Sequence, residues 1–116
     1  DIVGINDHER LIIATVCYYH NGNIPSMDSP IYYQLSQEDR VMVSKLAAIL
    51  QISNAINTSH SPKFEQVNVN MKNGKLNIYL TTLKNINLEK WAFIAKSKLF
   101  REVYGLNATI IKRGVL

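Results

Sequence analysis

The stretch VNVNMKNGKLNIYL at residues 67–80 decides how the second half of the chain folds. Apolar and polar side chains alternate on both sides of Asn73 and Gly74, which is the pattern of two strands with one buried face. Asn-Gly is a favoured pair in two-residue hairpin turns, since both turn residues need a positive φ. The sequence therefore predicts a β-hairpin at this place.

A helix and a further strand are expected after the hairpin. The spacing of the apolar residues predicts one helix over residues 88–104, with Asn87 as its cap and Gly105 as the left-handed residue that ends it. A short strand follows at residues 108–112. Residues 61–116 are thus expected to form a β-β-α-β unit with a three-stranded antiparallel sheet.

The helix over residues 88–104 carries two apolar stripes. The stripe expected to cover the sheet consists of Leu88, Ala92, Ala95, Leu99 and Val103. The opposite side presents Phe93, Phe100 and Tyr104, which the sheet cannot bury as well. Because such rings are costly to leave in water, we expect these interface candidates to meet the helical half, a further domain or a second copy of the chain.

Residues 1–60 are expected to be helical, which makes the fold class α+β. Asn6 and Glu9 suit the capping box of a helix that runs to about His20. Ser36 opens a second, longer helix. The stripe of this second helix expected to face the core consists of Met42, Leu46, Ile49, Leu50, Ser53 and Asn57.

The first helix is apolar on every side between residues 11 and 19, where only Thr15 is polar. A helix of this kind is typical of a protein interior. Ile13, Cys17 and His20 are expected on a buried face, with Cys17 as an inert thiol. Since the chain begins at Asp1 without an initiator methionine, we expect a piece of a longer protein whose preceding helices cover this one.

The composition is that of an ordinary globular domain, with 47% hydrophobic and 19% charged residues. The longest apolar run, residues 11–19, is too short for a membrane span, which takes about 20 residues. The net charge is +4 and is distributed unevenly along the chain, because residues 61–116 hold ten basic and three acidic side chains. This balance indicates a polyanionic partner, and a solvated basic surface without a ligand is the alternative. The candidate polyanion-binding residues are Lys63, Lys72, Lys75 and Arg113.

No catalytic centre can be assembled from the sequence. The glycines do not form a phosphate-cradling loop, and no nucleophile with its base and orienting acid is recognisable. A single cysteine excludes an intrachain disulfide and a cysteine-based zinc site. The chain by itself is therefore predicted to be inactive and to hold no metal.

Four stretches of the chain form a recognisable set, namely ERLIIA at 9–14, YHNGNIP at 19–25, DRV at 39–41 and LAAILQISNAINTSH at 46–60. Together they resemble the C-terminal region of the exopolyphosphatase and guanosine pentaphosphate phosphatase family. Trp91, Phe100 and the pair Tyr104 and Gly105 are similar to the family's last helix. The resemblance spans nearly the whole chain.

The resemblance implies that residues 1–60 are the second half of an HD-like helical domain and that residues 61–116 are the family's small C-terminal unit. In the family, phosphoanhydrides are hydrolysed in actin-like domains that lie upstream, and Mg²⁺ is the cation expected there. His20 resembles a metal-binding histidine of HD domains, while Asn54 and Asn57 stand in place of aspartates and Gln51 in place of an arginine. Since an amide is a weaker ligand for a hard cation than a carboxylate, these HD-type positions are degenerate and no cofactor is expected in this chain.

We therefore expect an accessory C-terminal fragment of a cytoplasmic, exopolyphosphatase-like phosphohydrolase that helps to bind polyphosphate or to form a homodimer. Its other partners would be the upstream actin-like domains of the same protein. No association with a membrane is expected. The alternative is a small basic nucleic-acid-binding module, in which the hairpin meets a phosphate backbone. The aromatic residues on a helix, instead of on a strand platform, favour the first hypothesis.

Overall fold

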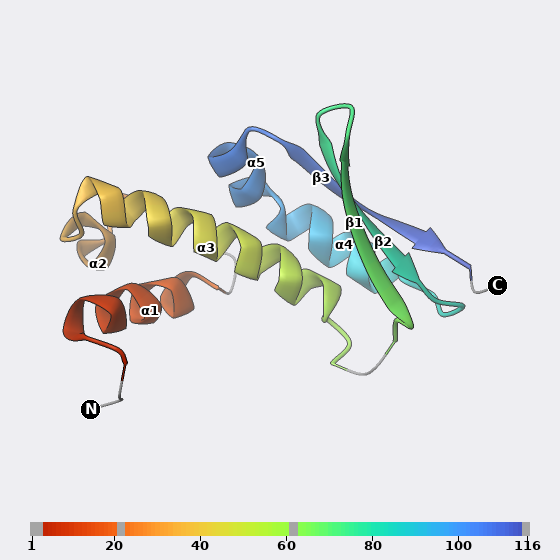
Figure 1. The fold of residues 1–116 in the computed structure, drawn as a ribbon, viewed down its shortest axis with the longest axis horizontal. Helices are drawn as coiled ribbons and strands as arrows, with labels where there is room; N and C mark the ends of the chain where they lie inside the picture. The colour runs from red at the N-terminus through yellow and green to blue at the C-terminus, as the bar shows by residue number, and fades with distance from the viewer. Residues whose placement is uncertain (1–3, 21–22, 61–62, 115–116) are drawn as a thin grey trace.

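The computed structural model describes residues 4–20, 23–60 and 63–114 and confirms the α+β class (Figure 1). The molecule is elongated, with extents of 49 × 33 × 22 Å. The helical half consists of α1 (Asp7–Tyr19), α2 (Pro30–Tyr33) and α3 (Gln37–Ile56). It is followed by β1 (Gln66–Lys72), β2 (Lys75–Thr81), α4 (Asn87–Lys96), α5 (Lys98–Tyr104) and β3 (Asn107–Arg113).

The hairpin forms where the sequence predicts it. Asn73 and Gly74 have φ angles of 56° and 72°, as the turn requires. Lys72 pairs with Lys75 beside the turn, and the register continues without a bulge to Gln66 opposite Thr81.

The sheet is mixed, so the prediction of a purely antiparallel sheet is wrong. The strand order is β1-β2-β3, and β2 pairs with β1 antiparallel but with β3 parallel. The reason is the crossover through α4 and α5, which returns the chain to the end of the sheet where β2 begins, so that Asn107 lies opposite Lys75.

The helix predicted over residues 88–104 is interrupted at Ser97, where α4 ends and α5 begins. Asn87 is the first helical residue and not the cap, which is Ile86. Within α4, Leu88 and Ala95 are exposed and Phe93 is buried, while Leu99 is buried after the interruption. The predicted division into a sheet-covering stripe and an opposite aromatic stripe is therefore wrong.

The two other helix starts follow the predicted capping. The side chain of Asn6 accepts from the amide of Glu9 at 2.8 Å, and Glu9 accepts from the amide of Asn6 at 3.1 Å. Ser36 caps α3 by accepting from the amide of Asp39 at 3.1 Å. The ring of His8 lies 2.7 Å from the Asp39 carboxylate, and this hydrogen bond lowers the pKa of Asp39. The starts of α1 and α3 are thereby joined.

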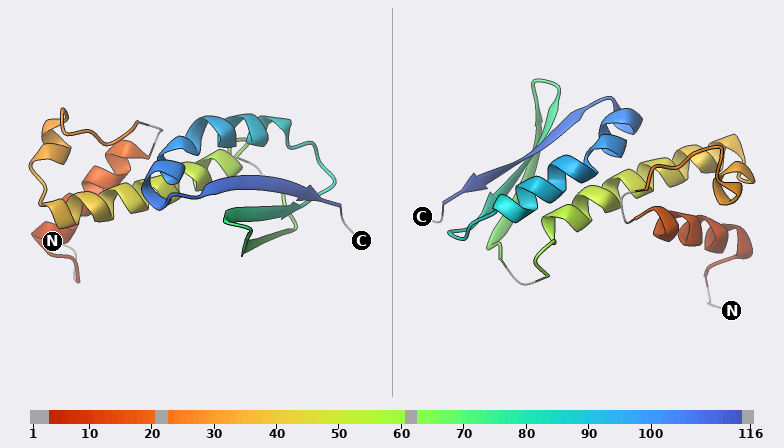
Figure 2. Two further views of the ribbon diagram at one scale, coloured as in Figure 1. Left: turned by 90° about the horizontal axis from the view of Figure 1, so that it is seen from above. Right: turned by 180° about the vertical axis from the view of Figure 1, so that it is seen from behind.

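The buried face of α3 is not the predicted one. Met42, Leu46, Ile49 and Leu50 are exposed, as are Ser53 and Asn57. The residues of α3 that are buried are Val43, Ala47, Ala48, Gln51, Ile52 and Ala55. α3 packs against α1 and against both α4 and α5, and alanines let neighbouring helices come close (Figure 2). The larger side chains are left on the outer surface.

α1 contacts the rest of the described chain through one face, and that face holds Ile12, Thr15 and Tyr19. Ile13, Cys17 and His20 are exposed, so the expected buried face of these three residues is wrong. The contact with α3 alone cannot cover a helix that is apolar all round.

One apolar core connects the helical half to the sheet. Its members include Val43, Ile52, Leu80, Phe93 and Phe100. No helix in the described ranges is both long and apolar enough to cross a lipid bilayer.

Candidate anion-binding surface

One face of the sheet is polar, and no helix of the described residues covers it. Side chains alternate along each strand, and Ile78, Leu80 and Ile110 are buried on the face toward the helices. We call the other face the open face. It consists of Gln66, Asn68, Asn70, Lys72, Lys75, Asn77, Tyr79, Thr81, Asn107, Thr109, Ile111 and Arg113. Figure 2 shows α4 and α5 on one side of the sheet only.

Three of the predicted polyanion-binding residues share the open face. Lys72 and Lys75 are cross-strand neighbours beside the hairpin turn, and Arg113 lies opposite Thr81 at the other end of the sheet. The two ends are roughly 20 Å apart, at about 3.3 Å per strand residue. The three strands contain no acidic residue, so every charged side chain on the open face is basic.

Tyr79 holds Arg113 in place on this face. The guanidinium carbon of Arg113 lies 3.8 Å from the centre of the Tyr79 ring, a cation–π contact. Stacking leaves the guanidinium N–H groups at the edge of the cation available for an anion, because the ring contacts only its flat side.

Amide and hydroxyl groups connect the three strands between the charged ends. The Asn77 side chain donates to Asn70 on β1 at 3.2 Å, and the Thr109 hydroxyl donates to Asn77 at 3.4 Å. The open face therefore offers hydrogen-bonding groups along its length as well as cations at its ends.

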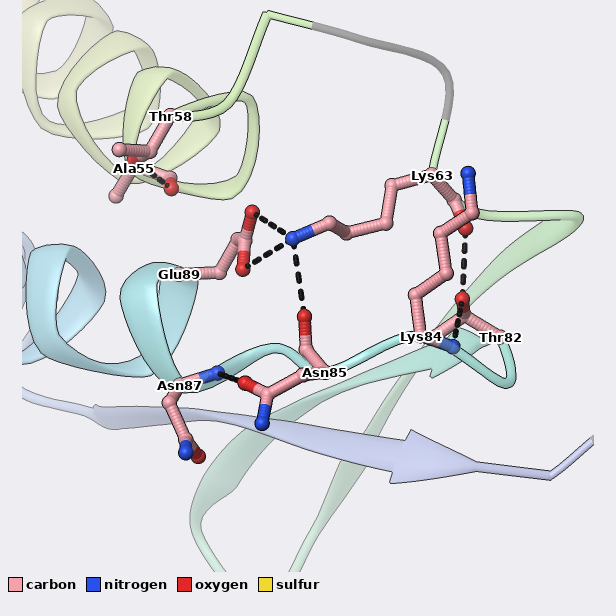
Figure 3. Close-up of polar contacts among 8 residues, drawn as sticks. All are labelled: Ala55, Thr58, Lys63, Thr82, Lys84, Asn85, Asn87 and Glu89. Atoms are coloured by element: carbon pink, nitrogen blue, oxygen red, sulfur yellow. Dashed lines mark hydrogen bonds and ion pairs between the residues drawn. The ribbon is translucent and has the colours of Figure 1, made fainter.

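Lys63 lies elsewhere and its charge is already neutralised. Its ammonium donates to both carboxylate oxygens of Glu89, at 3.1 and 2.9 Å, and to the carbonyl of Asn85 at 2.9 Å (Figure 3). Burial raises the pKa of Glu89, but hydrogen bonds from Lys63, its own backbone amide and Ser59 outweigh burial and leave that pKa below its ordinary value. Lys63 thus has a structural role, and its ion pair with Glu89 removes it from the open face that holds the other three candidates.

A pocket adjoins the open face along the free edge of β3. It has a volume of about 460 Å³ and an apolar floor that includes Phe93 and Ile110. Lys75, Lys90 and Arg101 line it, and within the described ranges none of these cations has an ion-pair partner. Lys75 belongs to both the pocket and the open face, so the two form one continuous basic surface.

The degenerate HD-type positions have structural partners. The His20 ring donates to the carbonyl of Cys17, and Asn57 forms the C-cap of α3. Asn54 is half-buried, and in the part of the chain described it has no hydrogen bond to His20. Gln51 is buried and donates to the carbonyls of Tyr19 and Asn23 at 2.7 and 2.9 Å, which fixes the end of α1 on α3.

Metal-binding groups do not cluster in the described ranges, where no three His, Cys, Asp or Glu side chains are placed to share an ion.

The aromatic residues of α4 and α5 join the two halves of the molecule. Phe93 and Phe100 are buried in the shared core. The rings of Phe100 and Tyr104 are 4.7 Å apart, and the Tyr104 hydroxyl donates to the carbonyl of Lys45 on α3 at 3.1 Å. Burial raises the pKa of Tyr104. Phe100 and Tyr104 therefore contact the helical half, which is one of the three surfaces expected for them.

Sequence reasoning missed Tyr79, Lys90 and Arg101. Alternation along β2 already places Tyr79 on the same side as Lys75, so this signal was available. Lys90 and Arg101 reach the pocket only because the crossover brings α4 and α5 beside β3, which no local pattern shows.

The sequence matches no protein-family model, and no curated protein is significantly similar to it.

Proposed function

We propose that this chain is the accessory C-terminal part of an exopolyphosphatase-like phosphohydrolase and that it holds polyphosphate on the open face. The observation that carries the proposal is the placement of Lys72, Lys75 and Arg113 on one face whose strands lack acidic residues. The resemblance of residues 9–25 and 39–60 to that family supports polyphosphate as the anion.

A linear polyanion suits this surface better than a compact one. The cations stand at the two ends of the open face, and the amides of Asn70 and Asn77 and the hydroxyl of Thr109 lie between them. Lys90 and Arg101 extend the basic surface around the edge of β3. Exposed cations attract a polyanion over about 8 Å at physiological ionic strength, so binding must weaken as salt is added.

Hydrolysis belongs, in this proposal, to the upstream actin-like domains of the longer protein and to the Mg²⁺ expected there. The chain described here binds and orients polyphosphate without cleaving it. Phosphate release by this chain at about 1 per second or faster would contradict that division of roles.

The proposal is tested by measuring polyphosphate binding calorimetrically at low and high salt. Reversing the charges with Lys72→Glu and Lys75→Glu is expected to weaken binding at least about tenfold, since both phosphate contacts are replaced by repulsion. The matched control is Lys45→Glu with Lys98→Glu, which changes the net charge equally but leaves the open face intact. Equal weakening by both double variants, or binding that persists in molar salt, would contradict the proposal.

Single-stranded nucleic acid is the second candidate, and the stack of Arg113 on Tyr79 favours it. Bases of a single strand stack on aromatic side chains, each contact contributing about 1–3 kcal/mol. Tyr79→Ala separates the two hypotheses: it should weaken binding of an oligonucleotide severalfold or more, because a stacking ring is lost, and binding of polyphosphate by less, because Arg113 loses its support but keeps its charge. Fluorescence anisotropy with a labelled single strand, competed by polyphosphate, gives both affinities.

A further inference from the structure

We infer that β1 is the seam of a homodimer, in which two copies pair their β1 strands antiparallel about a two-fold axis and join their sheets into one. Within the described ranges, β1 is an edge strand that is hydrogen-bonded to β2 on one side only. All of its residues are exposed, and three of them are apolar, namely Val67 (50% exposed), Val69 (58%) and Met71 (55%).

β1 lacks the features by which proteins protect an edge strand from pairing. Edges are commonly protected by proline, by a bulge or by a charge in the middle of the strand. β1 contains no proline, its register with β2 has no bulge, and its only charged residue is Lys72 at the end. The strand is thus free to accept another strand along its whole length.

The hairpin turn determines which backbone groups of β1 face outward. In a two-residue turn the flanking residues, Lys72 and Lys75, form a hydrogen-bonded pair, and such pairs then alternate along the ladder. Asn70 and Asn68 therefore bond inward to β2. The N–H and C=O groups of Val67, Val69 and Met71 point outward and provide about six hydrogen bonds in a symmetric pairing.

The sequence of β1 complements itself when the two-fold axis passes through Val69. Val69 then faces Val69 of the second copy, and Val67 faces Met71, so apolar side chains meet apolar ones on one face. On the other face Asn68 meets Asn70, and Lys72 meets Gln66. No two like charges are opposed, and this self-complementarity is what an isologous interface requires.

An apolar groove beside β1 has room for the apolar side chains of the second strand. It measures about 440 Å³, and α3 contributes Ile49, Ile52 and Ile56 to it while β1 contributes Val67 and Val69. An added strand continues the apolar face of the sheet over this groove. The two-fold axis that relates two antiparallel strands of one sheet is perpendicular to the sheet. The open faces of both copies therefore lie on the same side of the dimer.

The register is tested by disulfide formation in a Cys17→Ser background. Val69→Cys should crosslink two identical chains, since its partner across the axis is itself at about 5.5 Å between Cα atoms. Met71→Cys alone should not crosslink, but a mixture of Val67→Cys and Met71→Cys chains should. Equal crosslinking at every position, or none at Val69→Cys, would overturn the inference.

Sedimentation of the unmodified chain and of variants tests the dimer itself. The chain is expected to sediment as a dimer, and Val69→Lys, which opposes two cations across the axis, is expected to sediment as a monomer. The control Val69→Thr keeps a β-branched side chain and should stay dimeric. Far-ultraviolet circular dichroism checks that Val69→Lys remains folded. A monomeric parent chain at about 100 μM, or a folded Val69→Lys variant that remains a dimer, would refute β1 as the seam.

Discussion

The ammonium of Lys63 lies 2.9 Å from Oε2 of Glu89, whose side chain has no surface in contact with solvent. Glu89 is in the first turn of α4, and Lys63 precedes the hairpin, so the ion pair connects two segments that are far apart in sequence. The Thr82 hydroxyl also donates to the carbonyl of Lys63 at 2.7 Å and fixes the backbone of that residue (Figure 3). The pair therefore fixes the segment before the hairpin to the start of α4.

Lys63→Met is expected to lower the free energy of unfolding by about 3 kcal/mol, because it leaves a buried carboxylate without its cation. Lys72→Met removes an exposed cation and should change stability by less than about 0.5 kcal/mol. Urea denaturation measures both. The double variant Lys63→Met/Glu89→Leu should recover most of the loss, and a Lys63→Met chain as stable as the parent would show that the pair contributes nothing.

The stability of the parent and of Lys63→Met should depend on pH in opposite directions. In the parent, the pKa of Glu89 is below its ordinary value of 4.5, so this group's contribution is complete above pH 4.5 and is lost as the pH falls through the folded pKa. Without Lys63, burial raises the pKa of Glu89, and protonation then relieves the cost of the buried charge. The difference in melting temperature between the two chains should therefore narrow from pH 7 to pH 4.

Tyr19→Phe is expected to leave stability unchanged or to raise it by about 1 kcal/mol. The Tyr19 hydroxyl is buried and has no hydrogen-bond partner among the described residues, so its removal relieves a desolvation cost and breaks no bond to them. Tyr32→Phe is the matched comparison. The Tyr32 hydroxyl forms a hydrogen bond with the Ser44 hydroxyl at 2.9 Å, so its removal is expected to lower stability. Thermal melts that rank the two variants in the reverse order would contradict this account.

Phe100→Ala is expected to destabilise the chain by about 3 kcal/mol, since the ring is 5% exposed and packs between α3 and the sheet. Trp91→Ala removes a larger ring that is 80% exposed and should cost much less. Chemical denaturation of the two variants tests the difference. An unchanged midpoint for Phe100→Ala would mean that α5 does not hold the halves together.

The parts of the fold that were predicted correctly depend on residues close together in sequence. The capping box of Asn6 and Glu9, the turn at Asn73 and Gly74 and the left-handed Gly105 each need only a few neighbouring residues. Local hydrogen bonds and φ preferences therefore suffice to locate the helix starts and the hairpin.

The parts that were predicted wrongly depend on which elements meet in space. The period of 3.6 residues identified the Leu46 and Ile49 side of α3 as buried, but burial follows the close approach of α1, α4 and α5 to Ala47 and Ala48. In the same way, the parallel pairing of β3 results from the crossover through α4 and α5 and not from a local pattern.

The candidate site was predictable in part. Basic residues in the hairpin suggested Lys72 and Lys75, and alternation shows that they share a face. Lys63 has the same charge and similar neighbours in sequence, and only the buried Glu89 distinguishes it from a ligand-binding lysine. A pairing of this kind cannot be inferred from charge counts.

The parallel pairing of β2 with β3 also orders the events of folding. The hairpin can form early, because its strands are adjacent in sequence, but a two-stranded ribbon by itself is barely stable in water. β3 can add its hydrogen bonds only after α4 and α5 have formed and carried the chain back beside Lys75. Contacts between distant residues are slow to form, so completion of the sheet across this crossover is the step expected to limit the folding rate.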